Sequence, residues 1–157
     1  MAQQLWLLRH GDAEHDSGPD FDRRLTGRGE RQATAAGAAL ARLGVTFAAC
    51  YTSPRVRALD TARLACQQLG LEPEQLQALG DGFGREHALE LLRRHGGDER
   101  VLLVGHEPDF SQTVFDLTGG RVDFKKGGLA AVRVEAGGGT LLVLLRPREL
   151  SPLAAKD

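Results

Sequence analysis

The chain has 157 residues, which is enough for one domain with a substantial hydrophobic core. Its 20 Lys and Arg residues are balanced by 21 Asp and Glu residues, so the formal net charge is -1 and no basic excess favours a nucleic-acid partner. The sequence contains neither an apolar stretch of membrane-spanning length nor the pattern of a signal peptide. These properties predict a cytoplasmic, monomeric protein with a single domain over residues 1–157 and no membrane partner.

The two cysteines, Cys50 and Cys66, are not spaced as a CxxC motif. Cys50 lies in an apolar strand pattern and Cys66 in a helical one. We therefore expect two reduced thiols packed in the protein interior.

The first two thirds of the chain alternate between short apolar runs and segments in which small and apolar residues recur at helical spacing. The apolar runs predict strands over residues 5–8, 47–52, 76–79 and 101–104. The helical spacing predicts helices over residues 26–43, 53–69 and 85–95, and a fourth from Asp109 or Ser111 to about Thr118.

Two of these helices carry sequence signals at their ends. Thr26 is the expected N-cap of the first helix, and Gly44 is expected to end it. Ser53 is the expected N-cap of the second, with Pro54 at its first helical position.

The pattern changes after residue 128. Residues 129–135 and 140–145 alternate or run apolar around Gly137-Gly138-Gly139, which predicts a β-hairpin. From Pro147 onward we expect a loose tail. The whole order, βαβαβαβα and then ββ, predicts an α/β fold: a three-layer α/β/α sandwich whose mixed sheet is mostly parallel and ends in an antiparallel hairpin.

Arg9-His10-Gly11 follows the first expected strand directly. The carboxyl ends of strands in an open α/β sheet are where ligands bind. An arginine offers a fork of donors that matches a phosphate, glycine allows close approach of the backbone, and neutral imidazole is a nucleophile near pH 7. The triplet therefore predicts a contact with a phosphoryl group.

Two more strand ends carry polar groups of the same kind. Residues 53–57 (SPRVR) follow the second strand, and residues 105–108 (GHEP) follow the buried strand at 101–104. Neighbouring parallel strands bring these ends together, so a phosphate would meet Arg9, Arg57 and His106. Asp12 and Glu107 are expected at the rim of this site.

Four segments together resemble the histidine phosphatase superfamily, which has the phosphoglycerate-mutase-like fold, and most closely its short SixA-type phosphohistidine phosphatases. The segments are 8–13 (LRHGDA), 24–29 (RLTGRG), 53–58 (SPRVRA) with Thr61-Ala62, and 104–108 (VGHEP). The resemblance covers roughly residues 5 to 145. It implies that His10 is the nucleophile that accepts the phosphoryl group, that Arg9, Arg57 and His106 complete the phosphate pocket with Gly11, and that no metal or other cofactor is needed.

The chain departs from the superfamily at one point. Its mutases and broad phosphatases carry a glutamate general acid after the third strand, where this chain has residues 76–82 (LQALGDG), and the matching position is Ala78 or Leu79. An imidazole leaving group needs less protonation than an alkoxide does, so the departure favours a phosphoramidate substrate. Asp12, Asp81 and Glu86 remain alternative proton donors.

The sequence thus predicts a metal-independent phosphatase that works through phospho-His10, with a phosphohistidine protein as substrate. A phosphatase of small phosphomonoesters on the same fold is one alternative, and a non-catalytic phosphoprotein-binding module is another. Lys125-Lys126-Gly127 either guides an acidic partner or protects an edge strand.

Overall fold

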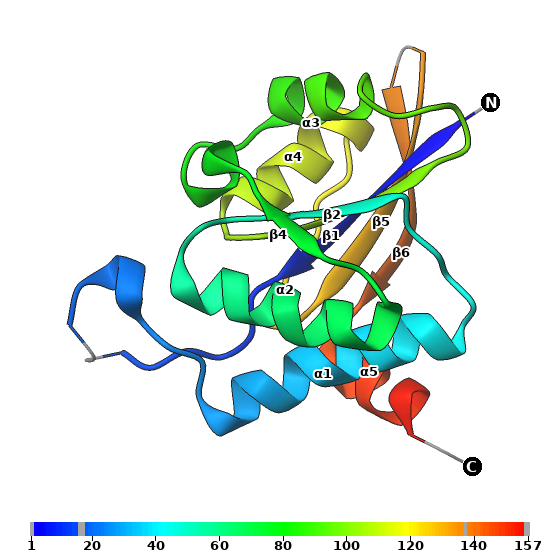
Figure 1. The fold of residues 1–157 in the computed structure, drawn as a ribbon. Coiled ribbons are helices and arrows are strands. Elements are labelled where there is room, and N and C mark those ends of the chain that lie inside the picture. Colours follow the sequence, from blue (N-terminus) through cyan, green and yellow to red (C-terminus); the bar gives the residue numbers. More distant parts are fainter. Residues whose placement is uncertain (1, 16–17, 137, 156–157) are drawn as a thin grey trace.

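A six-stranded sheet lies between two layers of helices in the computed structural model, which describes residues 2–15, 18–136 and 138–155 (Figure 1). The strands are β1 Gln3–Arg9, β2 Ala49–Thr52, β3 Pro73–Gln75, β4 Arg100–Gly105, β5 Leu129–Glu135 and β6 Gly138–Leu145. Their order across the sheet is β3-β2-β4-β1-β5-β6. The first four run parallel, and β5 and β6 form the antiparallel edge, so the predicted fold class and hairpin are confirmed. Gly137 of the predicted turn lies outside the described residues.

Two strands, β1 and β4, form the centre of the sheet, in register from Leu5 opposite Val101 to Leu8 opposite Val104. Both faces of these strands are covered by helices, which is why their sequences run apolar instead of alternating. Leu5 and Leu7 face one core layer, whereas Trp6 and Leu8 face the other.

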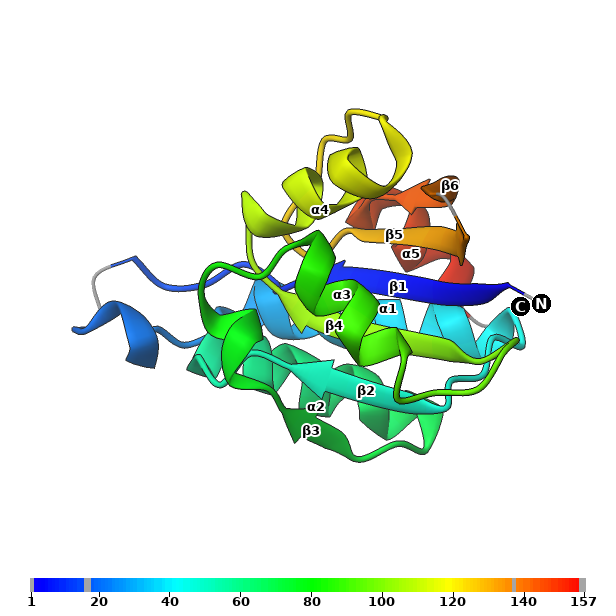
Figure 2. The same cartoon turned by 90° about the horizontal axis from the view of Figure 1, so that it is seen from above.

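The α-helices of the described residues, α1 to α5, form the outer layers of the sandwich (Figure 2). On one face lie α1 Gly27–Arg42, α2 Val56–Leu69 and α5 Pro147–Ala154; on the other lie α3 Arg85–Leu92 and α4 Asp109–Thr118. Thr26 caps α1 as predicted, because its Oγ1 accepts a hydrogen bond from the Gly29 N–H at 3.1 Å. No helix among the described residues is long and apolar enough to cross a bilayer.

The start of α2 differs from the prediction. The helix begins at Val56 with Arg55 as N-cap, because the Arg55 carbonyl accepts the first helical hydrogen bonds, from the N–H groups of Ala58 and Leu59. Ser53 is therefore not the helix cap. It belongs to the turn between β2 and α2, and its hydroxyl is used in the site described below.

The region after α2 was also predicted incorrectly. The strand is β3, Pro73–Gln75, and the apolar run that follows forms a 3₁₀ turn, η2 (Gln77–Gly80). Leu79 is apolar because it is buried in the core beneath this turn and not because it belongs to a strand.

The predicted loose tail is wrong. Residues 147–154 form α5, which begins with Pro147 at its first position. The Glu149 carboxylate accepts a hydrogen bond from the Arg146 N–H at 2.8 Å, and Leu150 is fully buried in the core layer that α1 and α2 share. Residues 156–157 lie outside the described part of the chain. Cys50 and Cys66 are both free and buried, as predicted.

Candidate active site

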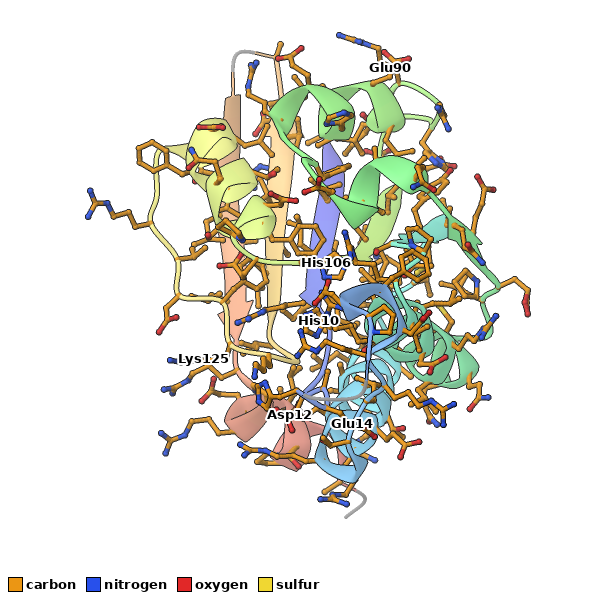
Figure 3. The ribbon with its side chains drawn as sticks, turned by 90° about the vertical axis from the view of Figure 1, so that its left-hand side faces the viewer. His10, Asp12, Glu14, Glu90, His106 and Lys125 are labelled. Carbon is orange, nitrogen blue, oxygen red and sulfur yellow. The ribbon has the colours of Figure 1, made fainter. Side chains whose placement is uncertain are left out.

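The carboxyl ends of three adjacent parallel strands meet at one edge of the sheet. His10 follows β1, Ser53 follows β2 and His106 follows β4, which lies between the other two. Backbone hydrogen bonds fix this arrangement, because the His10 N–H donates to the Gly105 carbonyl and the Ser53 N–H donates to the Val104 carbonyl. Figure 3 shows His10 and His106 close together beyond the end of β1. The structure thus brings together the three predicted segments.

His10 is held with one nitrogen committed to the backbone. Its Nδ1 lies 2.7 Å from the Gly11 carbonyl oxygen, which can only accept a hydrogen bond, so Nδ1 carries the proton. The other nitrogen, Nε2, bears the lone pair and lies 3.4 Å from Arg57 Nε. Burial, followed by the positive charges of Arg57 and Arg9, lowers the pKa of His10 to about 4 against the opposing hydrogen bond to Gly11. The imidazole is therefore neutral and nucleophilic at pH 7.

His106 forms the opposite wall. Its ring centroid lies 5.2 Å from that of His10, and its Nε2 lies 2.8 Å from Ser53 Oγ. Its Nδ1 is buried and has no hydrogen-bond partner among the described residues. Burial, with the nearby His10 and Arg57, lowers the pKa of His106 to about 3. Sequence reasoning missed the role of Ser53 because Ser-Pro is also a helix-capping signal.

Arg57 reaches the site from the first turn of α2. His10, Arg57 and His106 are 6%, 8% and 8% exposed, so all three side chains are buried where they contact one another. Arg57 also binds Asp20 in a 3₁₀ turn, η1 (Asp20–Asp22): Nη1 donates to the Asp20 carbonyl at 2.8 Å and Nη2 lies 3.3 Å from its Oδ2. The same carboxylate oxygen lies 2.8 Å from Arg55 Nη1. Sequence reasoning had not predicted this contact, because residues 20 and 57 are far apart in the chain.

Arg9 occupies the other side of the site. Its Nη1 donates a hydrogen bond to the Phe124 carbonyl at 2.7 Å, and its Nε is buried without a partner among the described residues. Burial lowers the pKa of Arg9, while Glu107 and Asp123 act against this shift. An arginine with a donor left unpaired is suited to an incoming anion.

Gly11 has a different role from the predicted one. Its N–H donates to Thr61 Oγ1 at 3.1 Å, so it does not point into the site as a phosphate donor. A Cβ at this position would lie 2.5 Å from the Gly29 carbonyl oxygen, so only glycine fits between β1 and the start of α1. Gly11 therefore positions His10, and Thr61 in turn donates to the Arg57 carbonyl at 2.7 Å.

Asp12 and Glu107, which the sequence predicts at the rim of the site, are both engaged in other contacts. Asp12 Oδ2 accepts a hydrogen bond from Thr26 Oγ1 at 2.8 Å, and its Oδ1 lies 3.5 Å from Lys126 Nζ. The Thr26 hydrogen bond is the main cause of a lowered pKa of Asp12, which disfavours the protonated form that a general acid requires. Glu107 Oε1 accepts from the Ser111 N–H at 2.7 Å, at the start of α4.

The position expected for a glutamate acid carries no titratable group. Ala78 packs against the core and Leu79 is buried. Asp81 is exposed and lines a hollow of about 290 Å³ together with Arg55. Glu86 is 81% exposed and pairs with Arg85 on α3. Asp81 thus shares a hollow with Arg55, whereas Glu86 does not line that hollow.

No group of three or more His, Cys, Asp or Glu side chains in the described ranges is arranged to hold a metal ion.

The sequence matches known proteins over most of its length. Residues 5–90 match the Histidine phosphatase superfamily (branch 1). The chain is 34% identical over 139 residues to an uncharacterized protein of a Picosynechococcus species, covering 83% of this chain and 84% of that protein. It is 32% identical over 129 residues to the phosphohistidine phosphatase SixA homolog of Haemophilus influenzae, covering 74% and 78%.

The fold is also similar to that of a solved phosphatase structure. The structure of the protein histidine phosphatase SixA complexed with tungstate superimposes with a TM-score of 0.84 at 28% identity, covering 94% of this chain and 99% of that one. The class is that of phosphatases, which hydrolyse phosphoric groups. The chain belongs to the histidine phosphatase superfamily.

Proposed function

We propose that this chain dephosphorylates phosphohistidine in proteins, with His10 Nε2 as the nucleophile. The observation that carries the proposal is the hydrogen bond from His10 Nδ1 to the Gly11 carbonyl, because it leaves Nε2 unprotonated and facing Arg57. The similarity to a phosphohistidine phosphatase homolog and to a protein histidine phosphatase supports the same substrate class.

In the first step, the Nε2 lone pair forms a bond to phosphorus while the bond to the substrate imidazole nitrogen breaks. The substrate ring has already taken up one proton from solvent on its other nitrogen, so the electron pair of the broken bond stays with the ring and it leaves as neutral imidazole. Arg9, Arg57 and His106 stabilise the charge on the phosphoryl oxygens as the group passes between the two nitrogens. In the second step, water attacks phosphorus, and His10 leaves as neutral imidazole with inorganic phosphate as product.

The absence of a titratable group at Ala78 and Leu79 supports a nitrogen leaving group. General acid help contributes roughly 10²–10⁴-fold in enzymes, and an alkoxide depends on it. Imidazole has a conjugate acid with a pKa of about 6.5 and leaves with much less help. Asp81, in the hollow beside Arg55, is the residue that would favour a small phosphomonoester as substrate instead.

The test uses the wild-type chain and His10→Ala with a phosphohistidine protein and with sugar phosphates. We expect the wild type to release phosphate from the phosphohistidine protein faster than from sugar phosphates, and His10→Ala to lose at least 10³-fold of this activity, about the loss seen for a missing nucleophile. Brief incubation with a radiolabelled substrate should label the wild type and not the variant.

The matched control is His87→Ala, which removes an exposed histidine on α3 and should leave turnover unchanged. Full activity in His10→Ala would overturn the proposed nucleophile. Faster turnover of sugar phosphates would overturn the substrate class, and phosphate binding without turnover would show a non-catalytic binding module.

A further inference from the structure

A groove of about 550 Å³ adjoins the candidate active site, on the side of Arg9. It lies between the start of α1, the loop before β5 and the start of α5. Six cationic side chains line it: Arg9, Arg28, Lys125, Lys126, Arg146 and Arg148. In Figure 3, Lys125 and Asp12 lie on the side of His10 that is nearer to α5.

The groove is positive although the whole chain is not. Among the described residues, Asp12, Asp123 and Glu149 line the groove or pair with its cations, and Glu107 also acts on Arg9, so the cations are in excess by six to four. The Arg28 side chain makes no hydrogen bond or ion pair with the described residues, although its charge helps to lower the pKa of Asp12. Arg148 is 74% exposed and lies 3.9 Å from Glu149. A local excess of this kind in a chain of net charge -1 marks a surface for an anionic partner.

The groove is rigidly connected to the nucleophile. The Gly127 N–H donates to the carbonyls of both Arg9 and His10, at 3.1 and 2.9 Å, so the lysine-bearing loop is attached to the backbone of β1. Gly127 has a φ of 76°, which favours glycine at this position. Arg9 contributes to the groove and is the last residue of β1, directly before His10. A chain whose phosphorylated residue reaches His10 would therefore extend over the groove.

We propose that this groove binds acidic residues flanking the phosphorylated residue of the protein substrate. The proposal rests on the proposed function and adds a substrate preference to it. The cations are spread over four segments of the chain and remain partly exposed, which suits several carboxylates along a polypeptide better than one compact anion. Charge pairs of this kind contribute mainly to the rate and selectivity of association.

The test compares phosphohistidine peptides with acidic and with neutral flanking residues. The groove variant is Arg28→Gln/Lys125→Gln/Lys126→Gln/Arg148→Gln, which leaves Arg9 in place. We expect the wild type to prefer the acidic flank by about tenfold in kcat/KM at low salt, and the groove variant to lose that preference. Turnover of a small phosphoramidate should stay within about twofold, since it contacts Arg9 and does not reach the four substituted side chains. Salt should weaken the wild-type preference because exposed charges are screened within about 10 Å at 0.1 M.

The control variant removes equal charge elsewhere: Arg63→Gln/Arg85→Gln/Arg93→Gln/Arg133→Gln, all exposed and outside the groove. It should keep the wild-type preference. If both variants lose the preference equally, or if the groove variant keeps it, the proposal is overturned.

A binding measurement separates this proposal from the proposed function. Fluorescence anisotropy with a short labelled oligoglutamate peptide should show binding to His10→Ala protein and about tenfold weaker binding once the four groove substitutions are added. Absence of binding to His10→Ala protein would overturn the groove even if phosphohistidine is turned over. If oligoglutamate binds but the wild type does not turn over phosphohistidine, the proposed function is overturned and the proposed groove is not. Tighter binding of a single-stranded oligonucleotide than of oligoglutamate would overturn an acidic protein as the occupant.

Discussion

Two backbone carbonyl groups determine the chemistry of two key side chains. The Gly11 carbonyl selects the tautomer of His10, and the Phe124 carbonyl holds one end of the Arg9 guanidinium while Nε stays unpaired. Neither contact is encoded by the side-chain type alone, because each depends on where the backbone turns after β1 or before β5. The reactive form of His10 is thus built into the ground state of the fold.

The protonation of His10 gives the first prediction. Its folded-state pKa of about 4 lies below the ordinary value of about 6.5, so the unfolded chain binds more protons between these two values. The free energy of unfolding should therefore fall as the pH drops from about 6.5 toward about 4. NMR of the imidazole ring protons should show a titration midpoint near 4 for His10, assigned by its disappearance in His10→Gln. A midpoint near 6.5 would contradict the buried, neutral imidazole.

Thr61 is the second residue to test. It connects the Gly11 N–H to the Arg57 carbonyl, and Thr61→Val keeps its shape while leaving a buried N–H unpaired. We expect a loss of about 1–3 kcal/mol in the free energy of unfolding, and a lower kcat because His10 and Arg57 are less well oriented. Thr113→Val is the matched control, since buried Thr113 donates only to the Asp109 carbonyl within its own helix. Denaturant unfolding and phosphatase assays measure both variants, and equal effects on kcat would refute the positioning role.

Among the helices and strands, the sequence predicted the elements that are marked by a local apolar pattern. It missed the features that depend on contacts between residues far apart in the chain. The strands β1, β2 and β4 and the convergence of His10, Arg57 and His106 followed from apolar runs that end in polar residues. The start of α2 did not, because a Ser-Pro pair signals a cap in isolation while Ser53 here binds His106, which lies on another segment. Contacts of Asp20 with the arginines have no local sequence signal at all.

The helix α5 was missed for a related reason. Its sequence, PRELSPLA, contains a second proline, Pro152, which argues against a helix, although Pro147 at the first position and Glu149 in the first turn are helix-start signals that the sequence prediction did not use. It is stabilised by burial of Leu150 in the core between the sheet and helices α1 and α2. The helix therefore depends on packing against α1 and β6, and the sequence of α5 alone does not show these contacts.

The third prediction concerns this packing. Leu150→Ala should lower the free energy of unfolding by about 2–4 kcal/mol, because a fully buried leucine leaves a cavity. Leu153→Ala is the control on the same helix, since Leu153 is 37% exposed and its truncation should cost less than about 1 kcal/mol. Urea unfolding followed by circular dichroism measures both. Similar small effects for the two variants would mean that α5 does not contribute to the core.

For the whole molecule, the site is assembled from strand ends, a helix start and the η1 turn, so occupying it should stabilise the complete fold. A phosphate analogue such as vanadate at one hundred times its dissociation constant should add about 2.7 kcal/mol to the free energy of unfolding, or about 5–10 °C in Tm. Arg57→Ala should weaken vanadate binding by tenfold or more, since a charged hydrogen-bond donor is lost.

Arg63→Ala, an exposed substitution on the same helix that pairs with Asp60, is the control for the vanadate measurement and should keep the wild-type shift. Differential scanning fluorimetry across a vanadate series gives the affinities. An unchanged Tm in the wild type at saturating vanadate would contradict a phosphate site at these strand ends.

Asp20 has a consequence for the catalytic cycle of the proposed enzyme. In the resting protein, its carboxylate is shared by Arg55 and Arg57, so part of their positive charge is already offset before an anion enters the site. An entering phosphoryl group carries more negative charge than a carboxylate and displaces it from Arg57. When inorganic phosphate forms, the tethered carboxylate is still close by and competes for the same guanidinium. Asp20 thus competes with inorganic phosphate for Arg57, which favours release of the product after each turnover.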